Sequence, residues 1–277
     1  MKNKYNFKGN ILIIGGAEDK LNEMHILKKF FELSGEKKAS ILIVPIASDF
    51  PEVAANVYKT IFKKFGAKKI KIFNKYNPVE VRSQNLSKYF DGVTGIFISG
   101  GDQLRLSTVL GDSEFENLLK EKLRSGATIA GSSAGASALS SFMIVRGNPD
   151  LYASQDSLKL SAGLGVLENI IIDQHFTERK RLNRLITSVC YNPKNIGIGI
   201  DENTAIHIKK NGMLDVLGSG TVTIIDGSEI TYNNISEVDE YQPFSVIGLK
   251  MHILSSSISF NLNTLQPLNH SVNSFQL

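Results

Sequence analysis

The stretch ATIAGSSAGASAL, residues 127–139, decides the fold of this chain of 277 residues. It begins with the apolar run Ala127 to Ala130, turns through Gly131-Ser-Ser-Ala-Gly135, and continues with small residues that can open a helix. A short buried strand that turns directly into a helix is a building unit of α/β proteins. The stretch therefore predicts a strand of a parallel sheet with a tight turn at its carboxyl end.

Upstream of this stretch, short apolar runs alternate with amphipathic patterns. Further strands are expected at 11–14, 41–44, 70–73 and 95–99, and helices are expected in the stretch that runs to 33, from Pro51 to Gly66, and around 115–123. Short strands that are apolar throughout are typical of a parallel sheet buried on both faces. We therefore predict an α/β fold with a mainly parallel central sheet.

The pattern changes after residue 196, where strand-like runs follow one another closely. They lie at 196–200, 205–208, 214–217 and 222–225. Lys209-Lys-Asn-Gly212 is typical of a hairpin loop, so we expect the sheet to gain antiparallel strands here. One or two strands are expected between 244 and 260, followed by a polar, frayed tail over 261–277. No repeat or linker is visible, which predicts one domain over 1–277.

Composition narrows the class of protein. The chain is 42% apolar and 21% charged, with a formal net charge of +4, as expected of a globular protein. No apolar run approaches the roughly 20 residues that span a bilayer, and the polar start lacks the apolar core of a signal peptide. We expect a cytoplasmic protein without a membrane partner.

Cysteine and histidine usage gives no sign of a metal or a cofactor. The one cysteine, Cys190, cannot form an intramolecular disulfide, and the five histidines lack the spacing of a metal site. Residues 1–75 carry fifteen lysines, no arginine and seven acidic residues, a net charge of +8. Solvated helix faces account for these lysines, so nucleic acid is not expected as a partner.

Ser133 is the leading candidate for a catalytic residue. Gly131-Ser-Ser-Ala-Gly135 fits the pattern G-x-S-x-G, whose small flanking residues permit a turn that projects the central hydroxyl. The N–H groups at the start of the following helix, from Ala134, point at an anion that forms beside Ser133. Gly101, in a glycine pair after the strand at 95–99, would complete such an oxyanion hole. The alternative is a turn required only for close packing.

A nucleophilic serine requires a base, and His175 follows an apolar run that predicts a strand. The carboxyl end of that strand would bring His175 to the same edge of the sheet as Ser133. A carboxylate should orient the imidazole. Glu202 or Asp201, at the end of another strand, could serve, and Asp173 is a local rival. A structural histidine and a solvated turn are the alternatives.

Arg179, Arg181 and Arg184 lie close together in a chain that has only seven arginines. In a helix, Arg181 and Arg184 would share a face and Arg179 would point away. The guanidinium group suits the recognition of carboxylates. The cluster predicts a site for an acidic group of a substrate, with a solvated helix face as the alternative.

Five blocks of the sequence together resemble the cyanophycinase family. They are Gly15-Gly-Ala-Glu-Asp19, Gly100-Gly-Asp-Gln103, Gly131-Ser-Ser-Ala-Gly-Ala-Ser137, Asp173-Gln-His-Phe-Thr-Glu-Arg-Lys-Arg181 and Gly199-Ile-Asp-Glu-Asn-Thr-Ala205. The blocks follow the order expected for that family within residues 11–226. The order serine, histidine, acid differs from that of α/β-hydrolases and argues against an esterase or lipase.

The resemblance implies a three-layer α/β/α sandwich like that of class I glutamine amidotransferases, usually as a homodimer. It implies a serine peptidase in which Ser133 is the nucleophile, His175 the base and Glu202 the orienting acid. The implied substrate is cyanophycin, a poly-aspartate with arginine on each β-carboxyl, or shorter β-linked Asp-Arg peptides. The residues implied to shape the substrate pocket are Gln103, Asp173, Gln174, Arg179, Arg181 and Arg184.

Three other functions compete with this interpretation. An aspartyl dipeptidase of the same superfamily acts on short peptides, but its members are typically shorter and lack the full Asp-Gln-His-Phe-x-x-x-x-Arg run. A non-catalytic binding protein would not need Ser133, His175 and Glu202 intact. A glutamine amidotransferase requires a cysteine at the elbow, where this chain has serine, and Cys190 lies 57 residues away.

Overall fold

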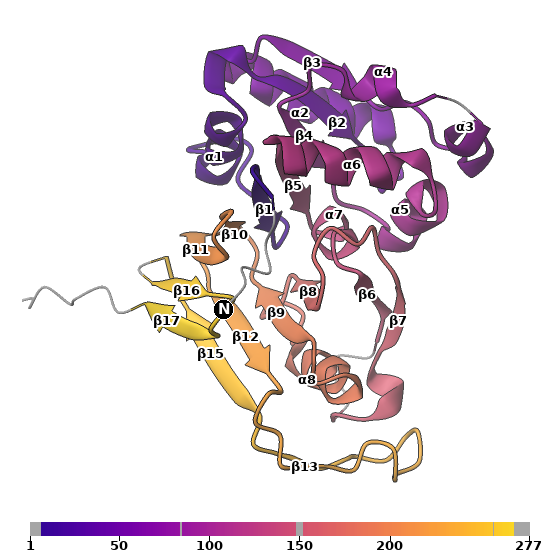
Figure 1. The fold of residues 1–277 in the computed structure, drawn as a ribbon, viewed down its shortest axis with the longest axis vertical. Coiled ribbons are helices and arrows are strands. Elements are labelled where there is room, and N and C mark those ends of the chain that lie inside the picture. Colours follow the sequence, from indigo (N-terminus) through magenta and orange to yellow (C-terminus); the bar gives the residue numbers. More distant parts are fainter. Residues whose placement is uncertain (1–6, 84, 148–151, 257, 269–277) are drawn as a thin grey trace, which may run out of the picture.

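The computed structural model describes residues 7–83, 85–147, 152–256 and 258–268, and this part of the chain is built around a nine-stranded sheet (Figure 1). The strand order is β17-β16-β11-β10-β1-β5-β4-β2-β3. The strands from β1 to β3 in this order are parallel, as the apolar runs predicted. Their bounds are β1 (Asn10–Ile14), β5 (Thr128–Ser132), β4 (Gly95–Ile98), β2 (Ser40–Val44) and β3 (Lys69–Ile72).

Antiparallel strands extend this sheet beyond β1. They are β10 (Thr204–Ile208), β11 (Met213–Gly218), β16 (Ser259–Asn261) and β17 (Gln266–Leu268). The predicted hairpin joins β10 to β11. The prediction of a frayed tail from 261 is wrong over 266–268, where β17 pairs with β16 through its backbone. Because the side chains of β17 are exposed, this strand has no apolar pattern that would have predicted it. Residues 269–277 lie outside the described residues.

A second sheet of four strands lies next to the first, in the order β15-β12-β9-β8. Its strands are β8 (Ile170–Gln174), β9 (Ile196–Ile200), β12 (Val222–Asp226) and β15 (Lys250–Leu254). We expected the strand-like runs after 196 to extend the central sheet, which is correct for β10 and β11 and wrong for β9 and β12. The turn at 201–203 carries the chain from one sheet to the other, because β9 pairs with β8 and β10 pairs with β1.

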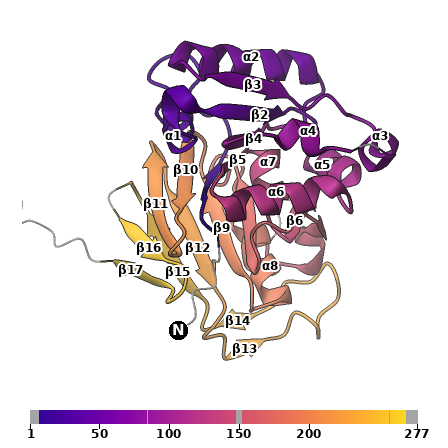
Figure 2. The same ribbon diagram turned by 45° about the horizontal axis from the view of Figure 1, so that its top comes forward.

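Helices cover both faces of the nine-stranded sheet (Figure 2). Side chains of a strand alternate between the two faces, so Leu12 and Ile14 of β1 face one helical layer, and Ile11 and Ile13 face the other. The first layer is α1 (His25–Leu33) and α2 (Pro51–Phe65), and the second contains α5 (Gln103–Leu110) and α6 (Glu114–Ser125). The predicted three-layer α/β/α arrangement is confirmed.

The first helix begins later than its apolar pattern indicates. The Asp19 carboxylate accepts the backbone N–H groups of Leu21, Asn22 and Met24 at 2.9, 3.0 and 3.0 Å. These backbone hydrogen bonds lower the pKa of Asp19. They stabilise an irregular loop over 15–24, and the helix starts only at His25.

The remaining elements are short. Helices of fewer than nine residues are too short to show a clear periodic pattern in the sequence. They are α3 (Pro78–Ser83), α4 (Ser87–Phe90), α7 (Ala134–Ala138), α8 (Leu182–Tyr191), the 3-10 turns η1 (Glu36–Lys38) and η2 (Gln155–Ser157), and the strands β6 (Phe142–Arg146), β7 (Lys159–Ala162), β13 (Tyr232–Asn233) and β14 (Val246–Ile247). None of the helices in the described part of the chain is long and apolar enough to cross a membrane.

Candidate active site

Ser133 lies on the turn between β5 and α7, in a conformation that few residues adopt. Its φ of 53° and ψ of −113° lie outside the usual regions, at a cost of about 1–3 kcal/mol for such a residue. The turn is close because a Cβ atom at Gly131 would lie 2.3 Å from the Gly135 oxygen, and one at Gly135 would lie 2.4 Å from the Ile98 oxygen. The glycines of the G-x-S-x-G pattern are therefore a packing requirement that leaves the serine at the apex.

Ser133, His175 and Glu202 are joined in one line of hydrogen bonds. Ser133 Oγ lies 2.9 Å from His175 Nε2, and His175 Nδ1 lies 2.5 Å from Glu202 Oε1. The side chain of His175 is 11% exposed and that of Glu202 is 37% exposed. With its Nδ1 hydrogen directed to Glu202, the imidazole can accept the Ser133 proton at Nε2. The arrangement can activate the hydroxyl for attack on a carbonyl group.

The line is assembled from both sheets, whereas we expected a single sheet edge. His175 follows β8, Ser133 follows β5, and the loop after β1 connects them, because the His175 N–H donates to the Gly15 oxygen at 2.9 Å. A Cβ atom at Gly16 would lie 2.5 Å from two atoms of the His175 ring. The glycine pair after β1 thus allows the imidazole to reach the elbow. His175 itself has a positive φ of 48°.

Asp201, the neighbour of Glu202, is engaged elsewhere. Its Oδ1 accepts the Thr177 N–H at 3.1 Å, and its Oδ2 accepts the N–H and the hydroxyl of Thr221 at 2.9 and 2.8 Å. Burial acts to raise the pKa of Asp201, but the hydrogen bonds from Thr177 and Thr221 lower it on balance. Asp201 ties together the loops around the site, and Glu202 is the acid beside His175.

Asp173 forms a buried ion-pair cluster with Arg181 and Arg184. Its Oδ2 accepts the Arg184 Nε hydrogen at 2.7 Å, and its Oδ1 accepts from Arg184 Nη2 and, at 3.4 Å, from Arg181 Nη1. Arg181 also donates to both side-chain and backbone oxygens of Gln174. Burial lowers the pKa of Arg181 to about 10, against the opposing effect of Asp173. The polar atoms of this cluster are bound mainly to one another.

Arg179 differs from the other two arginines. It is exposed, and its guanidinium has no partner among the described residues. The expectation that Arg181 and Arg184 share a face is correct, although the helix begins only at 182. Gln103, the first residue of α5, is half-buried and donates from Nε2 to the Ile144 oxygen of β6 at 3.1 Å.

Of the predicted oxyanion donors, Ala134 is the first residue of α7, directly after Ser133, and Gly101 lies in the loop after β4. Within the described ranges, neither the Ala134 N–H nor the Gly101 N–H has a hydrogen-bond acceptor. A Cβ atom at Gly100 would lie 3.0 Å from the Ser133 Cβ, so the loop after β4 passes directly beside the nucleophile candidate. Two free N–H groups near a serine hydroxyl are what a developing oxyanion requires. The described residues contain no cluster of three metal-ligating side chains.

Glu18, for which the sequence predicted no role, is buried next to the elbow. Its Oε2 accepts the Ser132 hydroxyl and its Oε1 accepts the Tyr58 hydroxyl, both at 2.6 Å, and Lys20 Nζ lies 2.9 Å from Oε1. The position of Glu18 in the loop that follows β1 is the sequence feature that could have predicted a role for this residue. That loop lies beside the end of β5, the strand that Ser133 follows.

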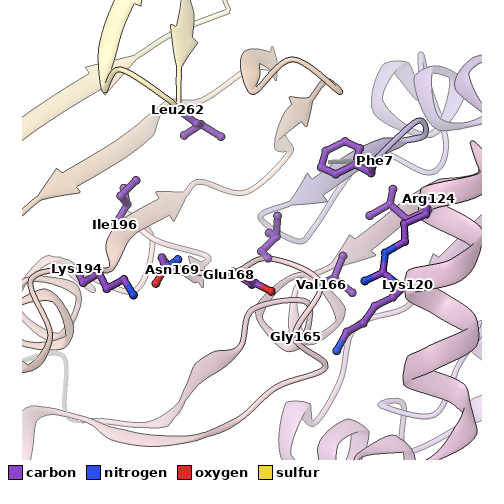
Figure 3. Close-up of a pocket in the computed structure, with 12 residues that line it drawn as sticks. Phe7, Lys120, Arg124, Gly165, Val166, Glu168, Asn169, Lys194, Ile196 and Leu262 are labelled. Atoms are coloured by element: carbon purple, nitrogen blue, oxygen red, sulfur yellow. The ribbon is translucent and has the colours of Figure 1, made fainter. Parts of the chain in front are cut away.

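A cleft of about 580 Å³ lies at the other end of the strands (Figure 3). Lys120 and Arg124 of α6 line one side, and Lys194 and Ile196 line the other, near the start of β9. None of the predicted site residues lines this cleft. Because the chemistry requires the serine, histidine and glutamate, we locate the candidate active site at the elbow and not in this cleft.

An α/β/α fold with a serine elbow beside a histidine is characteristic of serine hydrolases. The model of peptidase family S51 matches residues 11–216, so the chain belongs to peptidase family S51 and is a peptidase. Cyanophycinases of Nostoc sp. and Geminocystis herdmanii are 38% and 35% identical to it over 270 and 266 residues. The matches cover 96% of this chain and 91% and 98% of those proteins.

Solved structures show the same fold. The crystal structure of a peptidase from an acI-B1 Actinobacterium aligns with a TM-score of 0.64 at 21% identity and covers 92% of this chain and 100% of that one. A putative peptidase E from Listeria monocytogenes aligns with a TM-score of 0.53 at 15% identity and covers 76% of this chain and 99% of that one. The arrangement of helices and strands is thus shared with these two solved structures.

Proposed function

We propose that this chain is a serine peptidase that hydrolyses cyanophycin to β-aspartyl-arginine dipeptides. The observation that carries the chemistry is the continuous hydrogen-bonded line from Ser133 through His175 to Glu202. The substrate is inferred from the cyanophycinases that match 96% of the chain. An aspartyl dipeptidase is not favoured, because the curated relatives are cyanophycinases.

In the acylation step, Ser133 Oγ attacks a carbonyl carbon of the poly-aspartate backbone while His175 Nε2 takes the hydroxyl proton. Glu202 accepts the hydrogen of Nδ1 and stabilises the imidazolium that forms. The N–H groups of Ala134 and Gly101 bind the oxyanion. His175 then returns the proton to the departing amine, which leaves the acyl group on Ser133.

In the deacylation step, a water molecule attacks the acyl carbon and His175 takes one of its protons. The tetrahedral intermediate collapses, the bond to Ser133 Oγ breaks, and His175 returns the proton to the serine. The product is a β-aspartyl-arginine dipeptide with a free carboxylate. No metal ion or cofactor is needed for any of these proton transfers.

Substrate recognition is assigned to one exposed arginine, Arg179, and to a set of less exposed polar side chains. Each unit of the polymer carries a carboxylate and a guanidinium, and the exposed Arg179 is suited to the carboxylate. Gln103, which is half-buried, and Gln174, which is buried and accepts from Arg181, complete the proposed set. The cluster of Asp173, Arg181 and Arg184 has a supporting role, because it is buried and both arginines already bind the Asp173 carboxylate.

The test is incubation of the protein with insoluble cyanophycin and identification of the soluble products by mass spectrometry. The expected product is β-aspartyl-arginine, and Ser133→Ala should release none. Aspartate released from short peptides by a protein that leaves the polymer intact would instead identify an aspartyl dipeptidase.

The homodimer and the cytoplasmic location implied by the resemblance belong to the same proposal. Sedimentation velocity of the full chain at several concentrations tests the dimer. A species of about twice the 30.5 kDa mass of one chain is expected.

A further inference from the structure

A group of polar side chains lies behind the elbow, on the face of the sheet covered by α1 and α2. Glu18 comes from the loop after β1, Tyr58 from α2, and Ser132 is the last residue of β5. Both carboxylate oxygens of Glu18 accept hydroxyl hydrogens, from Ser132 and from Tyr58, at 2.6 Å each. Lys20 Nζ lies 2.9 Å from Glu18 Oε1 and 5.6 Å from the centre of the Tyr58 ring.

The group is closed and fully paired. The Glu18 side chain is 1% exposed, and its negative charge is balanced by Lys20 at the rim. Burial, and then the charge of Glu18, raise the pKa of Tyr58 well above its usual value, so the phenol remains a hydrogen-bond donor. Hydrogen bonds to a buried carboxylate are among the stronger ones in proteins. The position of the Ser132 hydroxyl is therefore well defined.

Ser132 directly precedes Ser133, the residue with the strained backbone conformation. Ser133 has φ 53° and ψ −113°, and such a conformation persists only where the surroundings impose it. Two contacts do so from the amino-terminal side: the Ser133 N–H donates to the Ile14 oxygen at 2.9 Å, and the Ser132 hydroxyl donates to Glu18. Because the peptide unit is planar, the ψ angle of Ser133 fixes the direction of the Ala134 N–H.

We infer that Glu18 is a positioning residue for the nucleophile, which acts through Ser132 to hold the elbow in the conformation where Ser133 Oγ faces His175 and the Ala134 N–H faces the oxyanion. Tyr58 and Lys20 hold the Glu18 carboxylate in turn. The inference rests on the proposed function in one respect only, that Ser133 is the nucleophile. It does not depend on the substrate.

The experiment compares four variants: Glu18→Gln, Ser132→Ala, Tyr58→Phe and Ser157→Ala. Ser157 is the matched control, since it is fully buried and its hydroxyl donates to the Ser154 oxygen at 2.7 Å, outside the elbow. Each variant is assayed for kcat and KM on β-Asp-Arg polymer, for thermal stability, and for the rate at which a small fluorophosphonate labels Ser133. The labelling rate reports on the elbow without any peptide substrate.

Glu18→Gln and Ser132→Ala should lower kcat about 10- to 100-fold with KM within about twofold, as expected for a displacement of the order of an ångström in a catalytic group. The labelling rate should fall in parallel. Tyr58→Phe should have a smaller effect of the same kind. The double variant Glu18→Gln/Ser132→Ala should be no slower than Glu18→Gln alone, because the two residues act as one unit. Ser157→Ala should change stability only.

The inference is overturned if Glu18→Gln and Ser132→Ala keep the wild-type kcat and labelling rate, if Ser157→Ala lowers them equally, or if only KM rises. Should Glu18→Gln fail to fold, Ser132→Ala and Tyr58→Phe carry the same test. A wild-type protein that labels at Ser133 but does not cleave cyanophycin would refute the proposed substrate and leave this inference standing. A wild-type protein that is not labelled at Ser133 would overturn both.

Discussion

Two groups of side chains meet at the end of β8, and they differ in almost every physical respect. His175 belongs to a line of three residues that is partly exposed, in which each member has one or two partners and two members have a positive φ. Asp173, two residues earlier, belongs to a cluster that is 1–9% exposed and in which both carboxylate oxygens are bound by guanidinium groups. Groups poised for a reaction keep a lone pair or a proton available, whereas groups that stabilise the fold have none to spare.

This contrast changes how the arginine-rich motif should be interpreted. Charge and spacing alone predicted a site for a substrate carboxylate, with Arg181 and Arg184 on one helix face and Arg179 pointing away. Two of them bind a carboxylate of the chain itself, and Arg179 alone is exposed. The expected consequences of substitution therefore fall into two kinds, loss of rate at the first group and loss of stability at the second.

The largest effect is expected for Ser133→Ala. Removal of the hydroxyl should lower kcat by about four to six orders of magnitude, as for other nucleophiles of this kind, while the small side chain still fits the elbow and the fold is retained. Turnover of β-Asp-Arg polymer and circular dichroism measure the two quantities. Ser132→Ala should lose far less activity, and the opposite ranking would mean that Ser132 is the nucleophile.

A second large effect on rate is expected for Glu202→Gln. The amide cannot stabilise the imidazolium or fix its tautomer, so kcat should fall by about three to four orders of magnitude with little change in KM. The free energy of unfolding should hardly change, because the side chain is 37% exposed. Asp201→Asn is the control, and stronger inactivation by that change would assign the acid to Asp201.

Asp173→Asn should affect stability before it affects chemistry. It leaves two buried guanidinium groups without their counter-charge, which typically costs about 3–5 kcal/mol. Urea unfolding at neutral pH measures the loss. The double variant Asp173→Leu/Arg184→Met leaves one guanidinium group, that of Arg181, without its counter-charge in place of two, and should be less destabilising than the single one. If the Asp173→Asn protein is stable but inactive, Asp173 acts in the reaction, and the division into a reactive group and a stabilising group is wrong.

The smallest effect is expected at Arg179. Arg179→Ala should lower kcat/KM on the polymer about 10- to 100-fold, the equivalent of one charged hydrogen bond of about 1.5–3 kcal/mol, with unchanged stability and unchanged labelling of Ser133. Arg181→Lys provides the contrast, since loss of the planar fork should lower the melting temperature first. If Arg179→Ala is silent, the substrate carboxylate is bound elsewhere.

Much of the fold could be predicted because its signals are local. A strand buried on both faces must be apolar throughout, as Ile41 to Val44 is, and a tight turn into a helix must be flanked by small residues, as at Gly131 and Gly135. The separation into two sheets has no such signal. It depends on whether β9 or β10 takes the place beside β1, and both strands are almost completely buried.

The site could be predicted in part for the same reason. Ser133 is marked by its neighbours in sequence, and His175 by the strand before it. The choice between Glu202 and Asp201 depends on the turn that follows β9, where hydrogen bonds from Thr177 and Thr221 direct Asp201 away. Those partners lie 20 or more residues away in the chain, and only the resemblance to a known family singled out Glu202.

The position of β1 in the middle of the large sheet also determines when this protein can fold. Ile11 pairs with residue 129 on one side and with Ile208 on the other, almost two hundred residues later. At about 5–20 residues per second, a ribosome needs roughly ten to forty seconds to synthesise the second partner after it has made the first strand. During that interval β1, which is apolar from Ile11 to Ile14, has an unpaired edge, the kind of surface that chaperones protect. Messages cut short before codon 204 should therefore yield aggregates and no partially active enzyme.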